Sequence, residues 1–428
     1  MTTRSKGAVR TVEPERSQGW LFVRMPGAEL AQDHPVRVVA ETVEKLDLSA
    51  FTEGALSVDG HAGRPVTSPK LKLALWMYGL QQGIGEATEI ARRCTQDEAF
   101  RWLAGGVDVS HDVLSEFLTG HRRELEGLLT QVMGLLLHHG LLDLERVAQD
   151  GTRVRASASS PSFRRRNALK RCREQARLHL KAVLAQADDP EVTQRQQAAR
   201  ESAARRFASR MEQALGELEK REAEDAARKA KDRSRDELRA STTDPEARVM
   251  KMADGGFRPG YNVQLAVAGS PEGGPRTIVA VQVTNRGNDA GSVGPMLAQV
   301  ERRTGQLPEK LLADGQHATV KDVKACLVEG VQPCISLPER MATGKGPHVD
   351  RSPEMEAWRE LMQTESGKAE ARARASLVEN VNAQVKGRYG LEQFAVRGLD
   401  KVTSVALMVA LAHNLAAHGQ ALLRALGA

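Results

Sequence analysis

Residues 146–152 read Arg-Val-Ala-Gln-Asp-Gly-Thr, and residues 310–315 read Lys-Leu-Leu-Ala-Asp-Gly. Each stretch is a short apolar run that ends in an aspartate followed by a glycine. This pattern predicts two strands, at 146–150 and 310–314, each holding an aspartate at its C-terminal end. The glycine is expected to turn the backbone sharply away from the sheet edge. If the two strands are neighbours, Asp150 and Asp314 meet.

A third carboxylate, Glu379, lies in the stretch Ser376-Leu-Val-Glu-Asn-Val-Asn-Ala-Gln-Val-Lys386, which has the period of an amphipathic helix. Magnesium prefers oxygen ligands. Two such ions about 3.5–4 Å apart can activate an attacking oxygen and stabilise a leaving one. The three carboxylates therefore predict a two-metal phosphoryl-transfer site. The pattern alone leaves an alternative open, in which each Asp-Gly is a plain turn and the glutamate is a solvated side chain.

Further strand and helix patterns surround these residues. Residues 261–268 and 277–284 alternate in polarity and are joined through Gly273-Gly274, which predicts a hairpin. Helical patterns follow at 289–300 and 320–328, the first expected to be capped by Asp289, and residues 331–337 form another expected strand. The last third of the chain is mostly helical. This order predicts an α/β fold, a mixed sheet flanked by helices.

The N-terminal part has a different character. Residues 1–66 are weakly patterned and are interpreted as an extension and linker, with a Gly/Pro-containing stretch at 59–66. Residues 67–142 contain short helical patterns separated by glycines, and Ser110 or Asp108 can cap one of them. This predicts an all-helical domain that binds DNA. A helix-turn-helix with His121-Arg122-Arg123 facing phosphates and a plain helical bundle both fit the pattern.

The excess positive charge of the chain is confined to one segment. Residues 161–240 contain 21 basic and 14 acidic residues, whereas the rest of the chain contains 40 and 41. The segment is predicted to be a helical insertion, a hairpin broken near 188–190 with a short heptad seam at Phe207, Met211, Ala214 and Leu218. A basic surface favours a polyanionic partner, although a solvated charged helix has the same composition.

The composition is that of a globular cytoplasmic protein. Of the 428 residues, 41% are hydrophobic and 27% are charged. The N-terminus lacks the apolar stretch of a secretory signal, and the longest apolar run, 405–412, is too short to span a bilayer. The four cysteines lack metal-type spacing and are expected to be buried, reduced thiols. His317 is expected to be a surface-loop histidine.

Several segments together resemble the DDE transposases of bacterial insertion sequences, in the branch with a helical N-terminal domain before an RNase H-like core. The collinear match runs from about Leu71 to the C-terminus. It is carried by Asp150-Gly-Thr-Arg-Val-Arg-Ala-Ser-Ala158, Thr243-Asp-Pro-Glu-Ala-Arg-Val-Met250, Gly260-Tyr-Asn-Val-Gln264, Val283-Thr-Asn285 with Asn288-Asp289, Leu312-Ala-Asp314, Val378-Glu379 through Gln384-Val-Lys386, Phe394-Ala-Val-Arg-Gly-Leu-Asp-Lys-Val402 and Ala412-His-Asn-Leu415.

The resemblance implies an RNase H-like catalytic domain built from 143–160 and 241–428. It also implies that Asp150, Asp314 and Glu379 are catalytic and hold two Mg²⁺ ions, for which Mn²⁺ can substitute. Relatives carry an arginine one turn before the glutamate, where this chain has Ala375 with Arg374 and Arg372 nearby. The residues expected to contact DNA are Lys386, which follows the glutamate by seven positions, and Arg153, Arg372, Arg374, Arg388, Arg122 and Arg123.

Two departures from the family pattern lie beside the carboxylates. After the second aspartate, relatives often have a small residue, a glycine and an aromatic, where this chain has Gly315-Gln316-His317. After the glutamate they often have Pro-Val-Phe-Gly, where this chain has Asn380-Val-Asn-Ala383. These departures motivate an alternative function, a catalytically inactive, domesticated DNA-binding protein derived from a transposase.

The expected activity is metal-dependent cleavage of the element's ends followed by strand transfer. The partners are double-stranded DNA, both element ends and target, and a second copy of the chain in a homodimer on DNA. The protein is expected in the bacterial cytoplasm, associated with the nucleoid when bound, with no membrane association. A further alternative is an RNase H-like nuclease without strand transfer.

Overall fold

The computed structural model describes residues 11–15, 30–53, 57, 65–185, 193–234, 236–342 and 350–427. Two expectations therefore lie wholly or largely outside the described residues. They are the linker at 59–66 and the hairpin break at 188–190.

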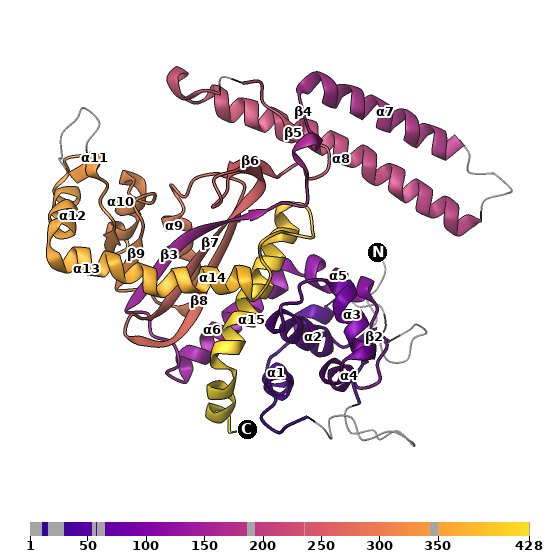
Figure 1. The fold of residues 1–428 in the computed structure, drawn as a ribbon, viewed down its shortest axis with the longest axis horizontal. Helices are drawn as coiled ribbons and strands as arrows, with labels where there is room; N and C mark the ends of the chain where they lie inside the picture. The colour runs from indigo at the N-terminus through magenta and orange to yellow at the C-terminus, as the bar shows by residue number, and fades with distance from the viewer. Residues whose placement is uncertain are drawn as a thin grey trace.

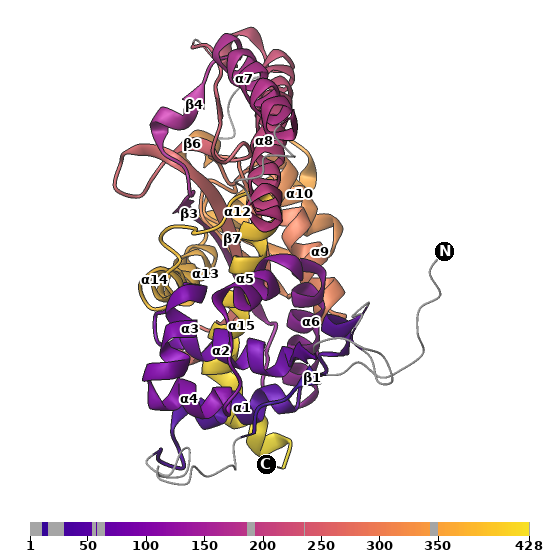
Figure 2. The same cartoon turned by 90° about the vertical axis from the view of Figure 1, so that its right-hand side faces the viewer.

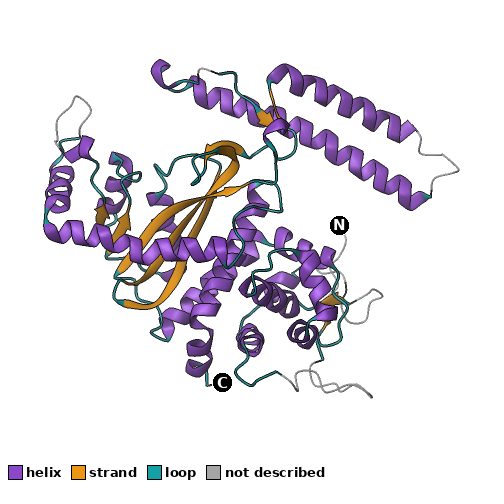
Figure 3. Ribbon diagram, in the orientation of Figure 1, coloured by secondary structure: helices purple, strands orange, loops and turns teal. Residues whose placement is uncertain are grey.

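A mixed six-stranded sheet forms the centre of the molecule (Figure 1, Figure 3). Its order is β10 (Gln332–Ile335), β9 (Lys310–Ala313), β3 (Arg146–Arg155), β7 (Phe257–Ser270) and β6 (Arg248–Lys251), with β8 (Gly273–Thr284) also paired to β7. β3, β9 and β10 are parallel, whereas β7 is antiparallel to β3, β6 and β8. The predicted strands at 146–150 and 310–314 are thus direct neighbours.

Helices cover both faces of this sheet. On one face lie α13 (Glu365–Arg374), a π turn (η4, Ala375–Glu379) and α14 (Asn380–Gly387), which run across the strands in front of β3 and β9 (Figure 1). Helix α12 (Pro353–Gln363) lies beside the sheet at its β10 end and contacts β10. Behind the sheet lie α9 (Val293–Thr304) and α10 (Val320–Val328), and the short α11 (Glu339–Ala342) follows β10. The predicted α/β arrangement, a mixed sheet flanked by helices, is confirmed.

The long helix α15 (Leu399–Ala425) connects this layer to the N-terminal helices. It contacts β8 and also packs against α1 (Pro35–Glu44), α2 (Pro69–Gln81), α5 (His111–Gly120) and α6 (Arg122–His138). It is the one helix among the described residues that is long and apolar enough to cross a bilayer. Its apolar window is 83% buried within the protein, which is typical of a core helix.

The N-terminal helical layer has the short helices that its glycines predict. Besides the helices named above, it contains β1 (Thr11–Val12), η1 (Ser49–Thr52), β2 (Val66–Thr67), α3 (Ala87–Gln96) and α4 (Glu98–Ala104). The Ser110 hydroxyl caps α5, and Gly120 ends it. The layer shares one hydrophobic core with the sheet, because Leu71, Val147 and Leu407 belong to the same buried cluster.

A helical hairpin projects from one end of the sheet (Figure 1, Figure 2). It consists of α7 (Arg166–Ala185) and α8 (Gln194–Ala226), and η2 (Ser160–Ser162), η3 (Ala230–Asp232) and the paired strands β4 (Phe163–Arg164) and β5 (Ala240–Ser241) lie at its base. Of the predicted seam, Met211, Ala214 and Leu218 are fully buried, whereas Phe207 is 37% exposed. Phe207 is therefore not part of the buried seam.

Candidate active site

Asp150 lies in the middle of β3, in register with Leu265 of β7. The prediction that the strand ends at this aspartate is wrong, because β3 continues to Arg155 with Val154 buried. Gly151 is therefore not a turn. A Cβ atom at this position would overlap the side chains of Gln264, Asp289 and Asn262, so the glycine is needed for close approach of these polar groups.

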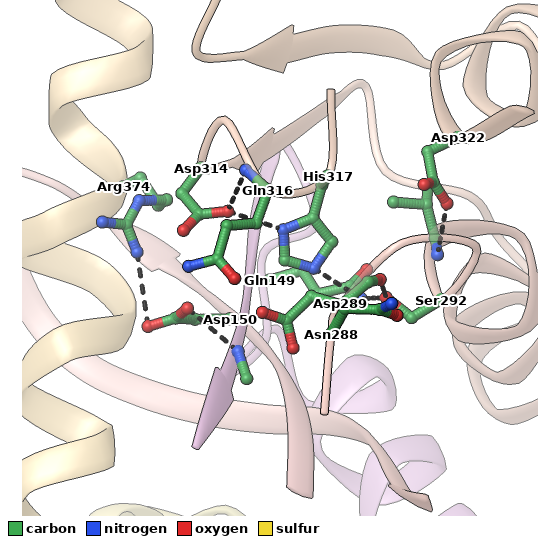
Figure 4. A network of polar contacts seen from close by, with 12 residues as sticks. Gln149, Asp150, Asn288, Asp289, Ser292, Asp314, Gln316, His317, Asp322 and Arg374 are labelled. Atoms are coloured by element: carbon green, nitrogen blue, oxygen red, sulfur yellow. Dashed lines mark hydrogen bonds and ion pairs between the residues drawn. The ribbon is translucent and has the colours of Figure 1, made fainter. Parts of the chain in front are cut away.

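Asp314 follows β9 directly, at the strand's C-terminal end as predicted. One oxygen, Oδ1, accepts hydrogen bonds from the Gln316 amide and from His317 Nδ1, each at 2.9 Å. Among the described residues, Oδ2 receives no hydrogen bond. Figure 4 places this second oxygen on the side of Arg374 and Asp150.

His317 is fully buried, so its prediction as a surface-loop histidine is wrong. The loop after β9 turns inward, and the imidazole occupies a site between Asp314 and two buried glutamines, Gln149 and Gln264. Burial there is possible because both ring nitrogens lie near polar partners.

The two aspartates differ electrostatically. Burial raises the pKa of Asp150, and the negative charge of Asp314 raises it further, against the opposing effect of Arg374. Burial also opposes ionisation of Asp314, but the hydrogen bond and charge of His317, the Gln316 backbone amide and the charge of Arg374 together lower the pKa of Asp314.

Glu379 is connected to Asp150 through Arg374. Arg374 Nη2 donates to Glu379 Oε1 at 2.8 Å, and Nη1 lies 3.4 Å from Asp150 Oδ2 (Figure 4). Arg374 and Glu379 are five positions apart, and an α-helix does not place residues with this spacing on one face. The π turn 375–379 between them does, because its repeat is one residue longer. The arginine that contacts the glutamate is therefore Arg374 and not Arg372, and the position one helical turn before the glutamate is occupied by Ala375.

Helix α14 brings two more side chains to Asp150. Asn382 Nδ2 donates to Asp150 Oδ2 at 3.0 Å, and the amide oxygen of Asn382 is buried without a partner among the described residues. Burial lowers the pKa of Lys386, an effect that the charges of Glu392 and Asp150 oppose. The predicted lysine thus lies within electrostatic range of the first aspartate.

The oxygen-rich donor set suits a hard cation, but the three carboxylates are not gathered into one ligand group. Within the described residues, no three His, Cys, Asp or Glu side chains lie together as metal ligands. The Glu379 side chain is 55% exposed and paired with Arg374, whereas those of Asp150 and Asp314 are 20% and 27% exposed. The expected site therefore consists of two neighbouring aspartates, and Arg374 lies between Glu379 and Asp150.

The other residues predicted to contact DNA have varied surroundings. Arg153 points inward and bonds to the buried carboxylate of Asp289 at 3.1 Å and to the Gly287 carbonyl at 3.2 Å. It is therefore a structural partner of the polar cluster in this structure, not an exposed cation. Arg372 is 71% exposed on α13.

The remaining three arginines are exposed. Arg388 follows α14, with its guanidinium over the Tyr389 ring. Arg122 and Arg123 lie at the start of α6, where Arg122 pairs with Asp400 of α15. No contact in the described structure links this pair to the carboxylates.

Sequence reasoning missed the buried polar cluster behind the aspartates, defined as Gln149, Asn262, Gln264, Asp289, Ser292 and His317. Figure 4 shows Gln149, Asp289, Ser292 and His317 of this cluster. Asp289 was expected to cap a helix, but α9 begins at Val293 without a side-chain cap. Instead its Oδ1 accepts from Asn262 and Gln264. A signal did exist, since Asn262 and Gln264 occupy alternate positions of an otherwise apolar strand and so share one face.

Comparison with protein families gives two matches. Residues 339–417 match a model described as a transposase DDE domain, and residues 26–120 match one described as a transposase domain, DUF772. The first match contains Glu379, Arg374 and Lys386, and the second covers the helices α1–α5. Asp150 and Asp314 lie outside both matches. No curated protein matches the chain significantly.

Proposed function

We propose that this chain, a member of the insertion-sequence DDE transposase family, cleaves the ends of its element and joins them to target DNA at Asp150, Asp314 and Glu379. The observation that carries the proposal is the contact chain from Glu379 through Arg374 to Asp150, with Asp314 on the adjacent strand. It ties segments that are far apart in the sequence to one location.

The strand order supports an RNase H-like core. Three antiparallel strands (β8, β7 and β3) continue into two parallel ones (β9 and β10), with the aspartates on the central strand and its parallel neighbour. We assign residues 143–160 and 241–428 to this catalytic domain. Residues 67–142 would form the DNA-binding helical domain after the 1–66 extension, and the basic insertion 161–240 would hold DNA or a second protomer.

The carboxylates would hold Mg²⁺ or Mn²⁺, which supply activation of the attacking oxygen and stabilisation of the leaving one when bound. The protein's own residues supply position and charge. Asn382 and Arg374 fix the Asp150 carboxylate, and Arg374 holds Glu379 close by. Lys386, half-buried near Asp150, would bind the phosphate beside the scissile bond and hold it in line.

The test uses purified full-length protein and DNA that carries the native flanks of the coding region, with Mg²⁺. Asp150→Asn, Asp314→Asn and Glu379→Gln should each reduce cleavage on the order of 10³-fold or more while DNA binding persists. A variant that keeps near wild-type cleavage removes its residue from the proposed site. A labelled end then separates a transposase, which joins that end to target DNA, from a nuclease, which only cuts.

A second candidate, an inactive DNA-binding descendant, is favoured by one observation. Glu379 is half-exposed and paired with Arg374, and no three-carboxylate ligand group exists in the described parts of the chain. This candidate predicts salt-sensitive DNA binding by the wild type with no metal-dependent cutting. Cleavage by the wild type that all three substitutions abolish rejects it.

A further inference from the structure

The Asp314 carboxylate is held asymmetrically. Both of its hydrogen bonds, from the Gln316 amide and from His317 Nδ1, reach Oδ1 at 2.9 Å. Oδ2 is left toward Arg374 and Asp150 (Figure 4). A carboxylate that pivots freely offers either oxygen, whereas one gripped at a single oxygen presents the other in one direction.

The grip on Oδ1 depends on a histidine that has little freedom to move. His317 is fully buried, and its far nitrogen, Nε2, lies 3.3 Å from Gln264 Oε1 and 3.5 Å from Gln149 Nε2. Nε2 therefore faces an acceptor, Gln264 Oε1, to which it donates when protonated. Nδ1 faces a carboxylate oxygen, so that nitrogen must carry the proton and donate.

The glutamines are themselves fixed by the cluster behind them. Gln264 Nε2 donates to Asp289 Oδ1 at 2.5 Å, so its amide oxygen has to face Gln149 and His317. Gln149 Nε2 donates to Gln264 Oε1 at 3.1 Å and to the Ser292 hydroxyl at 2.8 Å. A continuous series of buried hydrogen bonds thus runs from Asp289 to Asp314, and it restricts how far the His317 ring can move; the Gln149 amide oxygen has no partner among the described residues.

We propose that His317 is a positioning residue that holds Oδ1 of Asp314 so that Oδ2 faces the divalent cation. The inference rests on the proposed function, because it concerns the metal affinity of the same carboxylate. It assigns a role to one departure from the family pattern, the histidine at a position where relatives often carry an aromatic residue.

Three substitutions separate positioning from packing. His317→Phe removes both ring nitrogens. His317→Asn can place an amide nitrogen where Nδ1 lies and so keep a donor to Asp314. His317→Gln can place its amide where Nε2 lies and so keep the contacts to Gln149 and Gln264 without the donor. His418→Phe is the matched control, because His418 of α15 is also buried but bonds to Thr277 of β8.

The readout is Mn²⁺ binding to the full chain by electron paramagnetic resonance, with the Asp150→Asn/Asp314→Asn double variant as background, together with thermal unfolding of each variant. We expect His317→Phe to weaken the specific Mn²⁺ binding about 10–100-fold. His317→Asn should recover more of the affinity than His317→Gln, and His418→Phe should leave the affinity unchanged.

Two results would overturn the inference by itself. One is a folded His317→Phe protein with wild-type Mn²⁺ affinity. The other, which applies even if the Phe variant does not fold, is His317→Gln matching or exceeding His317→Asn in affinity. If the wild type binds no more Mn²⁺ than the double variant, the metal assignment of the proposed function fails, and the inference fails with it.

Discussion

Asp150 and Asp314 lie on neighbouring parallel strands, yet their surroundings differ in kind. Asp314 is gripped from behind by His317 and a buried cluster, and its pKa is lowered. Asp150 is contacted from the front by Arg374 and Asn382 on the helix layer, and burial raises its pKa. The comparison indicates that the position of the Asp314 carboxylate is fixed by the sheet and the cluster behind it. The position of the Asp150 carboxylate depends instead on how the helical segment that carries Glu379 packs on the sheet.

The largest expected effect comes from removing Asp289, the carboxylate of the buried polar cluster behind Asp314. Asp289→Ala would leave Arg153, Asn262 and Gln264 without their shared buried partner. We expect a loss of about 3–5 kcal/mol in the free energy of unfolding, since an uncompensated charge remains inside. Urea unfolding measures this.

The control is Glu365→Ala, which removes an 81%-exposed carboxylate and should leave the free energy of unfolding nearly unchanged. Equal losses for the two variants would mean that the cluster does not stabilise the fold.

The next effect concerns Arg374, on the helical segment in front of Asp150, and the rate of end cleavage. Arg374→Ala removes the link between Asp150 and Glu379, and we expect cleavage to fall roughly 10²-fold, the scale of losing one charged group at a reacting centre. Arg302→Ala serves as the control, because that side chain lies on α9 behind the sheet, is 62% exposed and pairs only loosely with Glu126 at 3.7 Å. Initial rates of end cleavage are the measurement.

A swap variant tests whether the π turn selects the arginine. In Arg374→Ala/Ala375→Arg, the arginine moves to the four-residue spacing that suits an ordinary helix. Because residues 375–379 form a π turn, we expect the swap to cleave as poorly as Arg374→Ala. Recovery to near wild-type rates would show instead that this segment adopts an α-helical register when the enzyme acts.

The smallest effect concerns the free energy of unfolding of the metal-free protein, to which the two aspartates should contribute with opposite signs. The lowered pKa of Asp314 contributes stability above the unfolded value of 3.8, and that contribution is lost as pH falls through the folded pKa. The raised pKa of Asp150 means that its ionisation costs stability at neutral pH, and the cost disappears as pH falls toward 3.8.

Asp314→Asn should therefore destabilise the protein at about pH 7, and Asp150→Asn should stabilise it. Urea unfolding in EDTA at about pH 7 and about pH 3.5 tests both, and the two differences should shrink at the lower pH. Shifts of the same sign at neutral pH would contradict the contrast between the two environments.

The sequence was sufficient to predict five of the six strands of the central sheet and most of the short N-terminal helices, whereas β6 and α1 were not predicted. Apolar alternation in 261–268 and 277–284 and the glycine breaks around 83–85 and 120 are local signals, and the structure has the expected elements there. The assignment of Asp150, Asp314 and Glu379 as catalytic stays a prediction, although the structure ties Glu379 to Asp150 and sets Asp314 on the adjacent strand.

What could not be predicted depends on contacts between distant segments. His317 reads as a loop residue until the glutamines of β3 and β7 enclose it, and Arg153 reads as a free cation until Asp289 is found beneath it. The choice among Arg372, Arg374 and Ala375 depended on one extra residue in a helical turn, which no spacing rule for a regular helix detects.

That extra residue has a consequence for how the helix layer is joined to the sheet. An added residue in a regular helix rotates everything beyond it by about 100°. Here the π turn absorbs it, so α13 keeps Glu370 against Arg146 and Lys310 while α14 independently keeps Asn382 against Asp150. The π turn thus lets α13 and α14 be aligned with the sheet separately. One residue can be inserted or deleted between the two helices without displacing the Glu370 contacts or the Asn382 contact.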